Sequence, residues 1–302
     1  MGGYDVLLFD PYFCDLIVTG LPELPRLGAD LFGTGMGIEA GGTFNTVRAL
    51  HRLQARVGWV CDFGNDLFSR FVLSEVANEG VDTGLFRIHD KPVRVFSLAF
   101  SYAHDRGFIS YMDPVEPVDR LPYIYEHQPR AILLNVLETG AAGLALARAA
   151  HEVDATVFLD TQATNATLET PDVTDMLRAA DVLLLNASEA VGITGASSRD
   201  DAGRLLAELT SLVVLKCGAD GAYAYQAGTI IHSPALRVTV VDTTGAGDCF
   251  NGGFIAARLR GEPLETCLRF GNICGGLSTT AHGAANTPTL DDVLRRIHPI
   301  QE

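Results

Sequence analysis

Short apolar runs alternate with amphipathic segments along most of the chain. The runs are rich in Val, Ile and Leu, which predicts buried β-strands, and the segments between them repeat apolar residues at helical spacing. This alternation is typical of a doubly wound α/β fold with a mostly parallel sheet and helices on both faces. The predicted strands are Val6–Phe9, Val57–Val60, Ala131–Asn135, Thr156–Asp160, Val182–Asn186 and Leu212–Lys216, and the predicted helices are Phe44–Leu53, Leu67–Glu79, Ala141–Glu152, Val173–Ala179 and Asp200–Leu209.

Two segments interrupt this alternation. Residues 11–40 are rich in Gly and Pro and contain short apolar alternations, and residues 91–112 contain two extended runs joined by a polar turn at Ala103–Gly107. We expect one domain over residues 1–302, with these insertions forming a small β-sheet that serves as an active-site lid. The alternative is that they are edge strands of the main sheet. The lid could also provide the contact of a homodimer.

The pattern changes after residue 215. Ala222–Gln226 and Thr229–His232 flank an Ala-Gly turn and predict a β-hairpin. Val238–Val241 predicts one more strand. Three helices are then expected, at Ala246–Arg260, Leu264–Ala281 and Leu290–His298.

Composition narrows the class of protein. Of 302 residues, 47% are hydrophobic and 20% are charged, so a large core can form. The net charge of −15 repels nucleic acid and anionic membranes, and a nucleotide site must therefore supply its own positive potential. The six cysteines are scattered without a C-x-x-C pair, which suits a reducing compartment. With no signal-peptide pattern at the start and no apolar run approaching the ~20 residues of a membrane span, we expect a cytoplasmic protein.

A glycine-rich turn opens the first of the three C-terminal helices. It reads Asp242-Thr-Thr-Gly-Ala-Gly-Asp248, and the small residues Gly245, Ala246 and Gly247 let the backbone approach a ligand. The N–H groups and dipole of a helix N-terminus favour an anion there. Beside a transferring phosphoryl group, Asp248 would accept the proton of the attacking hydroxyl, and the N–H groups of residues 245–248 would stabilise developing charge. An ordinary Asp cap on a glycine turn is the structural alternative.

This turn resembles the second signature of the ribokinase-like carbohydrate kinases, the PfkB family. The segment Gly41-Gly42-Thr43-Phe44-Asn45 resembles the first signature of this family. The motifs follow the family's order from about residue 5 to 298. The resemblance implies that Gly42 and Asn45 contact the hydroxyls of a sugar-like acceptor and that Asp15 is the family's early substrate-binding aspartate.

The resemblance also implies where ATP and metal ions bind. Asn186 and Glu189 resemble the N-x-x-E motif that acts with Mg²⁺ near the nucleotide, although a helix start with a capping Asn is the alternative. The remaining implied ATP-binding residues are Lys216, Gly218, Gly221 and Asn272. In many members, Asp242, Thr244 and the loop at 281–288 hold a monovalent cation, so K⁺ is a candidate.

The chain also departs from the family pattern. Thr43-Phe44 replaces the Lys-Gly-Ala of ribokinase-type sequences, which leaves ribose in doubt, and the run beginning at Asp160 lacks the D-P-N-x-R pattern. No basic cluster marks a pocket for a phosphorylated sugar, though Arg94 or Arg106 on the lid could serve.

These observations predict a sugar kinase, a phosphotransferase that uses ATP to phosphorylate a hydroxyl of a small polyhydroxylated acceptor, with a free sugar favoured. A nucleoside kinase of the same fold is the alternative, because several lid aromatics could stack on a base. A non-catalytic sugar-binding protein is more remote, because a pure binder has no need of Asp248.

Overall fold

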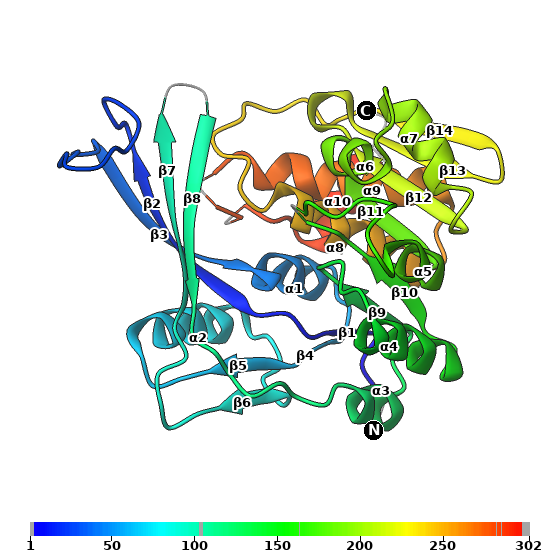
Figure 1. The fold of residues 1–302 in the computed structure, drawn as a ribbon, viewed down its shortest axis with the longest axis horizontal. Helices are drawn as coiled ribbons and strands as arrows, with labels where there is room; N and C mark the ends of the chain where they lie inside the picture. The colour runs from blue at the N-terminus through cyan, green and yellow to red at the C-terminus, as the bar shows by residue number, and fades with distance from the viewer. Residues whose placement is uncertain (1–2, 103–104, 163, 282, 285, 298–302) are drawn as a thin grey trace.

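Strands that are buried on both faces build one large sheet with a core on each side. The computed structural model describes residues 3–102, 105–162, 164–281, 283–284 and 286–297. The sheet has eight strands in the order β14-β13-β12-β11-β10-β9-β1-β4, parallel from β4 to β12 and closed by the antiparallel hairpin β13–β14 (Figure 1). The strands are β1 (Val6–Leu8), β4 (Val57–Trp59), β9 (Ala131–Leu134), β10 (Thr156–Leu159), β11 (Val182–Asn186), β12 (Leu212–Lys216), β13 (Ala222–Gln226) and β14 (Thr229–Ser233).

Helices cover both faces of this sheet, as the sequence predicts. Val6 and Leu8 of β1 belong to one apolar core and Leu7 to the other, because successive side chains point to opposite faces of a strand. The first core includes side chains of α1 (Thr43–Arg52), α2 (Leu67–Glu79), α8 (Ala246–Leu259), α9 (Leu264–Ser278) and α10 (Leu290–Ile297). The second includes α3 (Leu121–His127), α4 (Ala141–Glu152), α5 (Val173–Ala179), α6 (Ala187–Thr194) and α7 (Arg199–Leu206).

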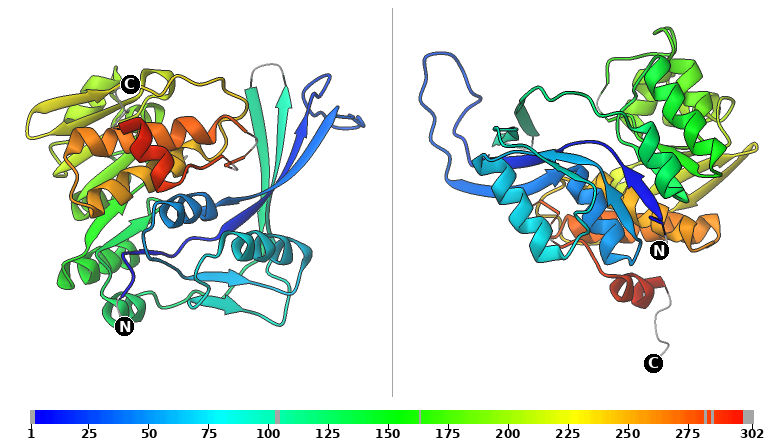
Figure 2. Two further views of the ribbon diagram at one scale, coloured as in Figure 1. Left: turned by 180° about the vertical axis from the view of Figure 1, so that it is seen from behind. Right: turned by 90° about the horizontal axis from the view of Figure 1, so that it is seen from below.

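The two inserted segments form a separate sheet, so the edge-strand alternative is wrong. Its order is β3-β2-β7-β8, and Figure 1 shows it to the left of the main sheet, while the right view of Figure 2 shows the loop between β2 and β3 projecting away from the helices. Its strands are β2 (Tyr12–Thr19), β3 (Gly35–Gly42), β7 (Val95–Tyr102) and β8 (Asp105–Met112). Part of the turn predicted at Ala103–Gly107 lies outside the described residues. We call this sheet the lid.

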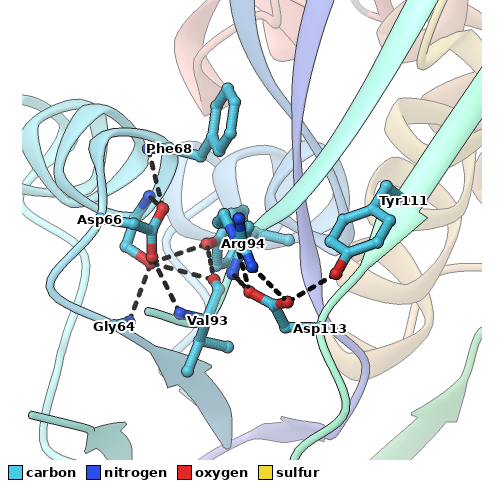
Figure 3. A network of polar contacts seen from close by, with 9 residues as sticks. Gly64, Asp66, Phe68, Val93, Arg94, Tyr111 and Asp113 are labelled. Atoms are coloured by element: carbon cyan, nitrogen blue, oxygen red, sulfur yellow. Dashed lines mark hydrogen bonds and ion pairs between the residues drawn. The ribbon is translucent and has the colours of Figure 1, made fainter. Parts of the chain in front are cut away.

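A polar network fixes the base of the lid to the N-terminus of α2 (Figure 3). Asp66 caps α2 by accepting from the backbone N–H groups of Phe68 and Ser69, and it also accepts from the N–H of Val93 at 3.0 Å. The Tyr12 hydroxyl donates to the Val93 carbonyl at 2.8 Å. Since Tyr12 begins β2 and Val93 precedes β7, the two segments that lead into the lid are bound to the same helix end.

Some elements differ from the sequence prediction. Val238–Val241 is not a strand: Val240 is 56% exposed, and the N–H of Val241 donates to the carbonyl of Thr279 at the end of α9. The segment crosses the end of a helix, where no neighbouring strand is available, so its β-rich composition has no partner to pair with. The sequence analysis also missed α3 and the two-stranded parallel sheet of β5 (Cys61–Phe63) and β6 (Phe86–Ile88). Within the described ranges, no helix is long and apolar enough to cross a membrane.

Replacing Asp66 by Ala should destabilise the protein by about 2 kcal/mol. The change removes a helix cap, worth roughly 1 kcal/mol, and leaves the Val93 N–H without its acceptor, at a similar cost. Urea unfolding at neutral pH measures the difference. Ser198→Ala is the matched control, because Ser198 caps α7 and should cost only about 1 kcal/mol.

The loss should depend on pH. Burial acts to raise the pKa of Asp66, but the hydrogen bonds from Ser69 and Val93 outweigh it, and the pKa is lowered. A lowered pKa means that ionised Asp66 stabilises the fold above its unfolded-state pKa of about 4 and loses this effect as pH falls further. The difference between wild type and Asp66→Ala should therefore shrink in acid, and a difference that grew there would contradict this account.

Candidate active site

A glycine turn leads into the N-terminus of α8. Gly245 precedes the helix with a φ of 73°, in the left-handed region that favours glycine. A Cβ at Gly245 would lie 2.6 Å from the Asn45 Nδ2 atom, so any side chain there would displace Asn45. The predicted turn therefore brings the start of α8 directly against α1.

Asp248 lies in the first turn of α8 and is partly buried. Asn45 Nδ2 donates to Asp248 Oδ2 at 3.2 Å, and Thr46 Oγ1 donates to the Asp248 carbonyl at 3.3 Å. Burial, together with the charges of Asp160 and Glu189, outweighs the Asn45 hydrogen bond and the Lys216 charge and raises the pKa of Asp248 to about 6. Such a carboxylate is ionised at neutral pH but basic enough to take a proton from a hydroxyl.

The lid carries a second carboxylate toward this helix. Asp15 on β2 is 7% exposed, and burial, Asp248 and Glu39 raise its pKa to about 7. A Cβ at Gly41 would lie 2.2 Å from Asp15 Oδ2, so glycine is required for the close approach. Gly42 has a φ of 62°, and a Cβ there would lie 2.8 Å from the backbone nitrogen of Phe13. The structure thus brings Asp15, Asn45 and Asp248 together, as the sequence predicts.

Three buried polar atoms around this cluster lack a hydrogen-bond partner among the described residues. They are Asn45 Oδ1, Asn135 Oδ1 and Thr161 Oγ1. Asn135 follows β9 and donates through Nδ2 to Thr43 Oγ1 at 3.2 Å, which ties it to the start of α1. Buried polar atoms are normally paired, so unpaired ones indicate a ligand site. Sequence reasoning missed Asn135, although a polar residue at the carboxyl end of a parallel strand is a recognisable signal.

A nearly buried ion pair lies beside the first two turns of α8. Lys216, at the end of β12, donates from Nζ to Asp160 Oδ2 at 2.7 Å and to Asn251 Oδ1 at 3.2 Å. Asn251 of α8 in turn donates to Asp160. Sequence reasoning assigned no site role to Asp160 or Asn251, because their contacts join segments far apart in the chain.

Asn186 and Glu189 form a capping box at the start of α6. Their geometry is therefore that of the helix cap, which was the alternative in the sequence analysis. Each side chain accepts from the other residue's backbone N–H at 2.8 Å. Burial and Asp160 raise the pKa of Glu189. Mg²⁺ keeps several waters and needs only one or two protein carboxylates beside substrate phosphates, so a single carboxylate near α8 fits such an ion. No group of three or more His, Cys, Asp or Glu side chains among the described residues could hold a metal ion without a substrate.

The other predicted nucleotide-binding residues meet at the end of the β13–β14 hairpin. Gly218 begins the 3₁₀ turn Gly218–Asp220, and Gly221 has a φ of 86° with its Cα so near β14 that a Cβ would lie 2.1 Å from the Ser233 carbonyl oxygen. Asn272 of α9 donates to the same carbonyl at 2.9 Å. Asn272 also lines a cavity of about 230 Å³ with Leu236 and Ile273.

Asp242 and Thr244 stabilise the turn before α8. The Thr244 N–H and hydroxyl both donate to Asp242 Oδ1, and the Gly283 N–H donates to Asp242 Oδ2 at 3.0 Å. Asp242 thereby joins the turn to the loop at 281–288, of which residues 282 and 285 lie outside the described residues.

Arg94 does not extend into this site. It forms a two-point ion pair with Asp113 at 2.8 and 3.0 Å, and Tyr111 donates its hydroxyl to the same carboxylate (Figure 3). This pair closes the base of the lid, where β7 begins and β8 ends. The side chain of Arg106 lies outside the described residues.

Comparison with known proteins identifies the family of this chain. A family model described as pfkB family carbohydrate kinase matches residues 34–291. Ribokinase of Haemophilus influenzae is 26% identical over 92% of this chain and 93% of its own length, and aminoimidazole riboside kinase of Salmonella typhimurium is 29% identical over 84% and 86%. The structure of Arabidopsis thaliana ribokinase complexed with ribose and ATP covers 98% of both chains, with a TM-score of 0.81 and 22% identity.

The family model spans most of the chain, and the fold, with its eight-stranded sheet and separate four-stranded lid, agrees with it. PfkB kinases use ATP with Mg²⁺. The protein therefore belongs to the PfkB family of carbohydrate kinases and is an ATP-dependent kinase with the ribokinase fold.

Proposed function

We propose that this kinase phosphorylates a hydroxyl of a small, uncharged polyhydroxylated acceptor, a free sugar in preference to a nucleoside. The observation that carries the proposal is the partly buried Asp248 carboxylate at the N-terminus of α8, with its raised pKa and its hydrogen bond from Asn45. In the reaction, the acceptor oxygen bonds to the γ-phosphorus of ATP, the bond from that phosphorus to the β–γ bridging oxygen breaks, and Asp248 takes the hydroxyl proton.

Each group at the site contributes in its own way. Asp15, Gly42 and Asn45 orient the acceptor, while the backbone N–H groups of residues 245–248 stabilise charge on the transferring group. Mg²⁺ bound with ATP neutralises phosphate charge, and Glu189 would hold it through water. The residues proposed to bind ATP are Asn186, Glu189, Lys216, Gly218, Gly221 and Asn272, and Asp242 and Thr244 are proposed to hold a monovalent cation such as K⁺.

Several oxygen atoms of the described residues on the acceptor side of the site can accept hydrogen bonds. Asp15 and Glu39 face each other in register across β2 and β3, and the unpaired oxygen atoms of Asn45 and Asn135 lie buried at the carboxyl edge of the sheet. Sugar hydroxyls can donate to all of these atoms, whereas a phosphate dianion would be repelled and left without cations. This supports an uncharged polyol.

The positions of the lid aromatics favour a sugar over a nucleoside. Phe96 pairs in register with Cys14 and Tyr111, whereas Asp15 pairs with Ser97, so Phe96 and Tyr111 lie on the face of the lid opposite Asp15. Phe96 also stacks on Phe68 of α2. These two rings therefore pack away from the acceptor, whereas Phe13 and Phe108 share the face of Asp15.

We also propose that the lid mediates a homodimer. Among the described residues, the face opposite Asp15 carries two rows of apolar side chains: Val18, Met36 and Phe100 in one row, and Leu16, Ile38, Leu98 and Ile109 in the next. In the row beyond them, Cys14 and Ala40 are already buried and Phe96 stacks on Phe68 of α2, so the contact would form on the first two rows. Met36 and Ile109 are 75% and 57% exposed. A second copy of the same sheet face would cover these side chains.

Asp248→Asn should abolish catalysis and spare ATP binding. The amide keeps the shape of the carboxylate but cannot take a proton, so kcat should fall by about 10²- to 10⁴-fold. Steady-state kinetics and calorimetric titration with ATP measure the two effects, and Asp291→Asn on exposed α10 is the control. Wild-type kcat/KM should rise with pH through about 6, because only ionised Asp248 is a base. A variant that retained nearly wild-type kcat would refute the mechanism.

An acceptor screen tests the substrate class. Free sugars should exceed their phosphate esters in kcat/KM by on the order of 100-fold, because a buried dianion without cations is costly. ADP formation is measured with free sugars, sugar phosphates and nucleosides. The result should not change in Arg94→Ala, because Arg94 pairs with Asp113. A preference for a sugar phosphate that was lost in Arg94→Ala or Arg106→Ala would overturn the proposal, and a preference for a nucleoside would favour the alternative.

Sedimentation velocity tests the dimer. The wild-type protein should sediment as a dimer at micromolar concentration, and Ile109→Glu should sediment as a monomer because it buries a charge in the contact. Ile88→Glu, at an equally exposed position on β6, should remain dimeric. A monomeric wild type would exclude this contact.

A further inference from the structure

Lys216 is an unusual residue for this chain. Lys91 and Lys216 are the only two lysines in the sequence, and arginine supplies every other basic side chain apart from histidine. Lys91 is exposed, whereas the side chain of Lys216 is only 12% exposed. A chain that otherwise uses arginine therefore keeps one lysine, almost buried, at the carboxyl end of a central strand.

Two buried side chains hold the Lys216 ammonium in one position. Asp160 and Asn251 are 4% and 0% exposed, and they form a closed ring of hydrogen bonds with Lys216. Among the described residues, this ring uses two of the three N–H donors of the ammonium. Burying an ion pair gains little stability over an apolar replacement, so stability alone does not explain a lysine here. The third N–H donor of the ammonium therefore calls for a functional explanation.

The ammonium lies between the groups that handle phosphate. It is 3.6 Å from the position that a Cβ at Gly247 would occupy, so it lies beside the start of α8. Its charge lowers the pKa of both Asp248 and Glu189, which places it near the proposed base and the carboxylate proposed for Mg²⁺. The buried hydroxyl of Thr161, next to Asp160 in the chain, has no partner among the described residues, which also indicates a ligand here.

We propose that Lys216 is a catalytic residue whose ammonium binds an oxygen of the γ-phosphoryl group and stabilises it during transfer, with Asp160 and Asn251 as positioning residues. The inference rests on the proposed phosphoryl transfer at Asp248 and goes beyond nucleotide binding by the loop that follows Lys216. A compact ammonium can donate to a single phosphate oxygen in a narrow space, whereas the planar, forked guanidinium of arginine would need more room.

The test compares ATP with ADP, which lacks the γ-phosphate. Affinities for both nucleotides with Mg²⁺ are measured by calorimetry without an acceptor, and kcat is measured with the best acceptor. In Lys216→Met, ATP affinity should fall about tenfold while ADP affinity stays within about twofold, because one charge-assisted hydrogen bond is lost. The kcat should fall by on the order of 100-fold. Lys216→Arg should recover ATP affinity better than kcat, and Lys91→Met should match wild type.

Removing Lys216 alone leaves Asp160 buried without its partner and could unfold the protein. Asp160→Asn combined with Lys216→Met removes both charges, and this double variant should fold and show the same selective loss of ATP affinity. Asp160→Asn alone should lower kcat about tenfold with little change in the KM for ATP, because the ammonium remains but is less well held.

Two results would overturn the inference. One is an equal loss of ATP and ADP affinity in the folded double variant, which would make Lys216 a structural residue. The other is a kcat for Lys216→Met within about threefold of wild type. Because the binding comparison needs no acceptor, a failure of the acceptor proposal would leave it intact, and the two failures can be told apart.

Discussion

The crowding of carboxylates around the N-terminus of α8 is the constraint on which the rest of the site depends. Asp15, Asp160, Glu189 and Asp248 come from four different elements, and burial raises the pKa of Asp15, Glu189 and Asp248. Mutual repulsion would separate such groups in an unfolded chain, so the packed fold must hold them together. The opposing attractions are the helix N-terminus, the Asn45 amide and the Lys216 ammonium. A site built in this way can bind cations and can accept hydrogen bonds from hydroxyl groups.

The distribution of basic side chains follows from the same constraint. Most described arginines form ion pairs away from the site: Arg52 with Glu79 between α1 and α2, Arg120 with Glu138 beyond β9, and Arg94 with Asp113 at the base of the lid. These pairs connect elements but add no positive charge near α8. In a chain with a net charge of −15, Lys216 and the start of α8 are the groups that we propose as the source of the positive potential that a nucleotide requires.

The lid and the main sheet contribute different parts of the site. Parallel strands present their carboxyl ends at one edge, which brings Asn135, Asp160, Asn186 and Lys216 near one another although they are distant in sequence. The lid adds Asp15, and its base is fixed to α2 through Asp66, Tyr12 and Val93. The relatives are kinases named for different acceptors, so the few side chains at the lid and at β9 are where acceptor choice would be decided.

The sequence by itself determined the strand–helix order, the separate lid and the cluster of Asp15, Asn45 and Asp248, because these depend on local periodicity and on short motifs with a glycine at each close approach. The partners of those residues were decided only by the tertiary structure. Asp160, Asn251 and Lys216 meet across three elements, and Asn135 reaches α1 only once β9 lies beside β1. Val238–Val241 shows the converse, since its β-rich sequence pairs with no described strand and adopts no regular secondary structure. Local sequence specifies backbone preference, whereas pairing and burial depend on which distant segments the fold brings together.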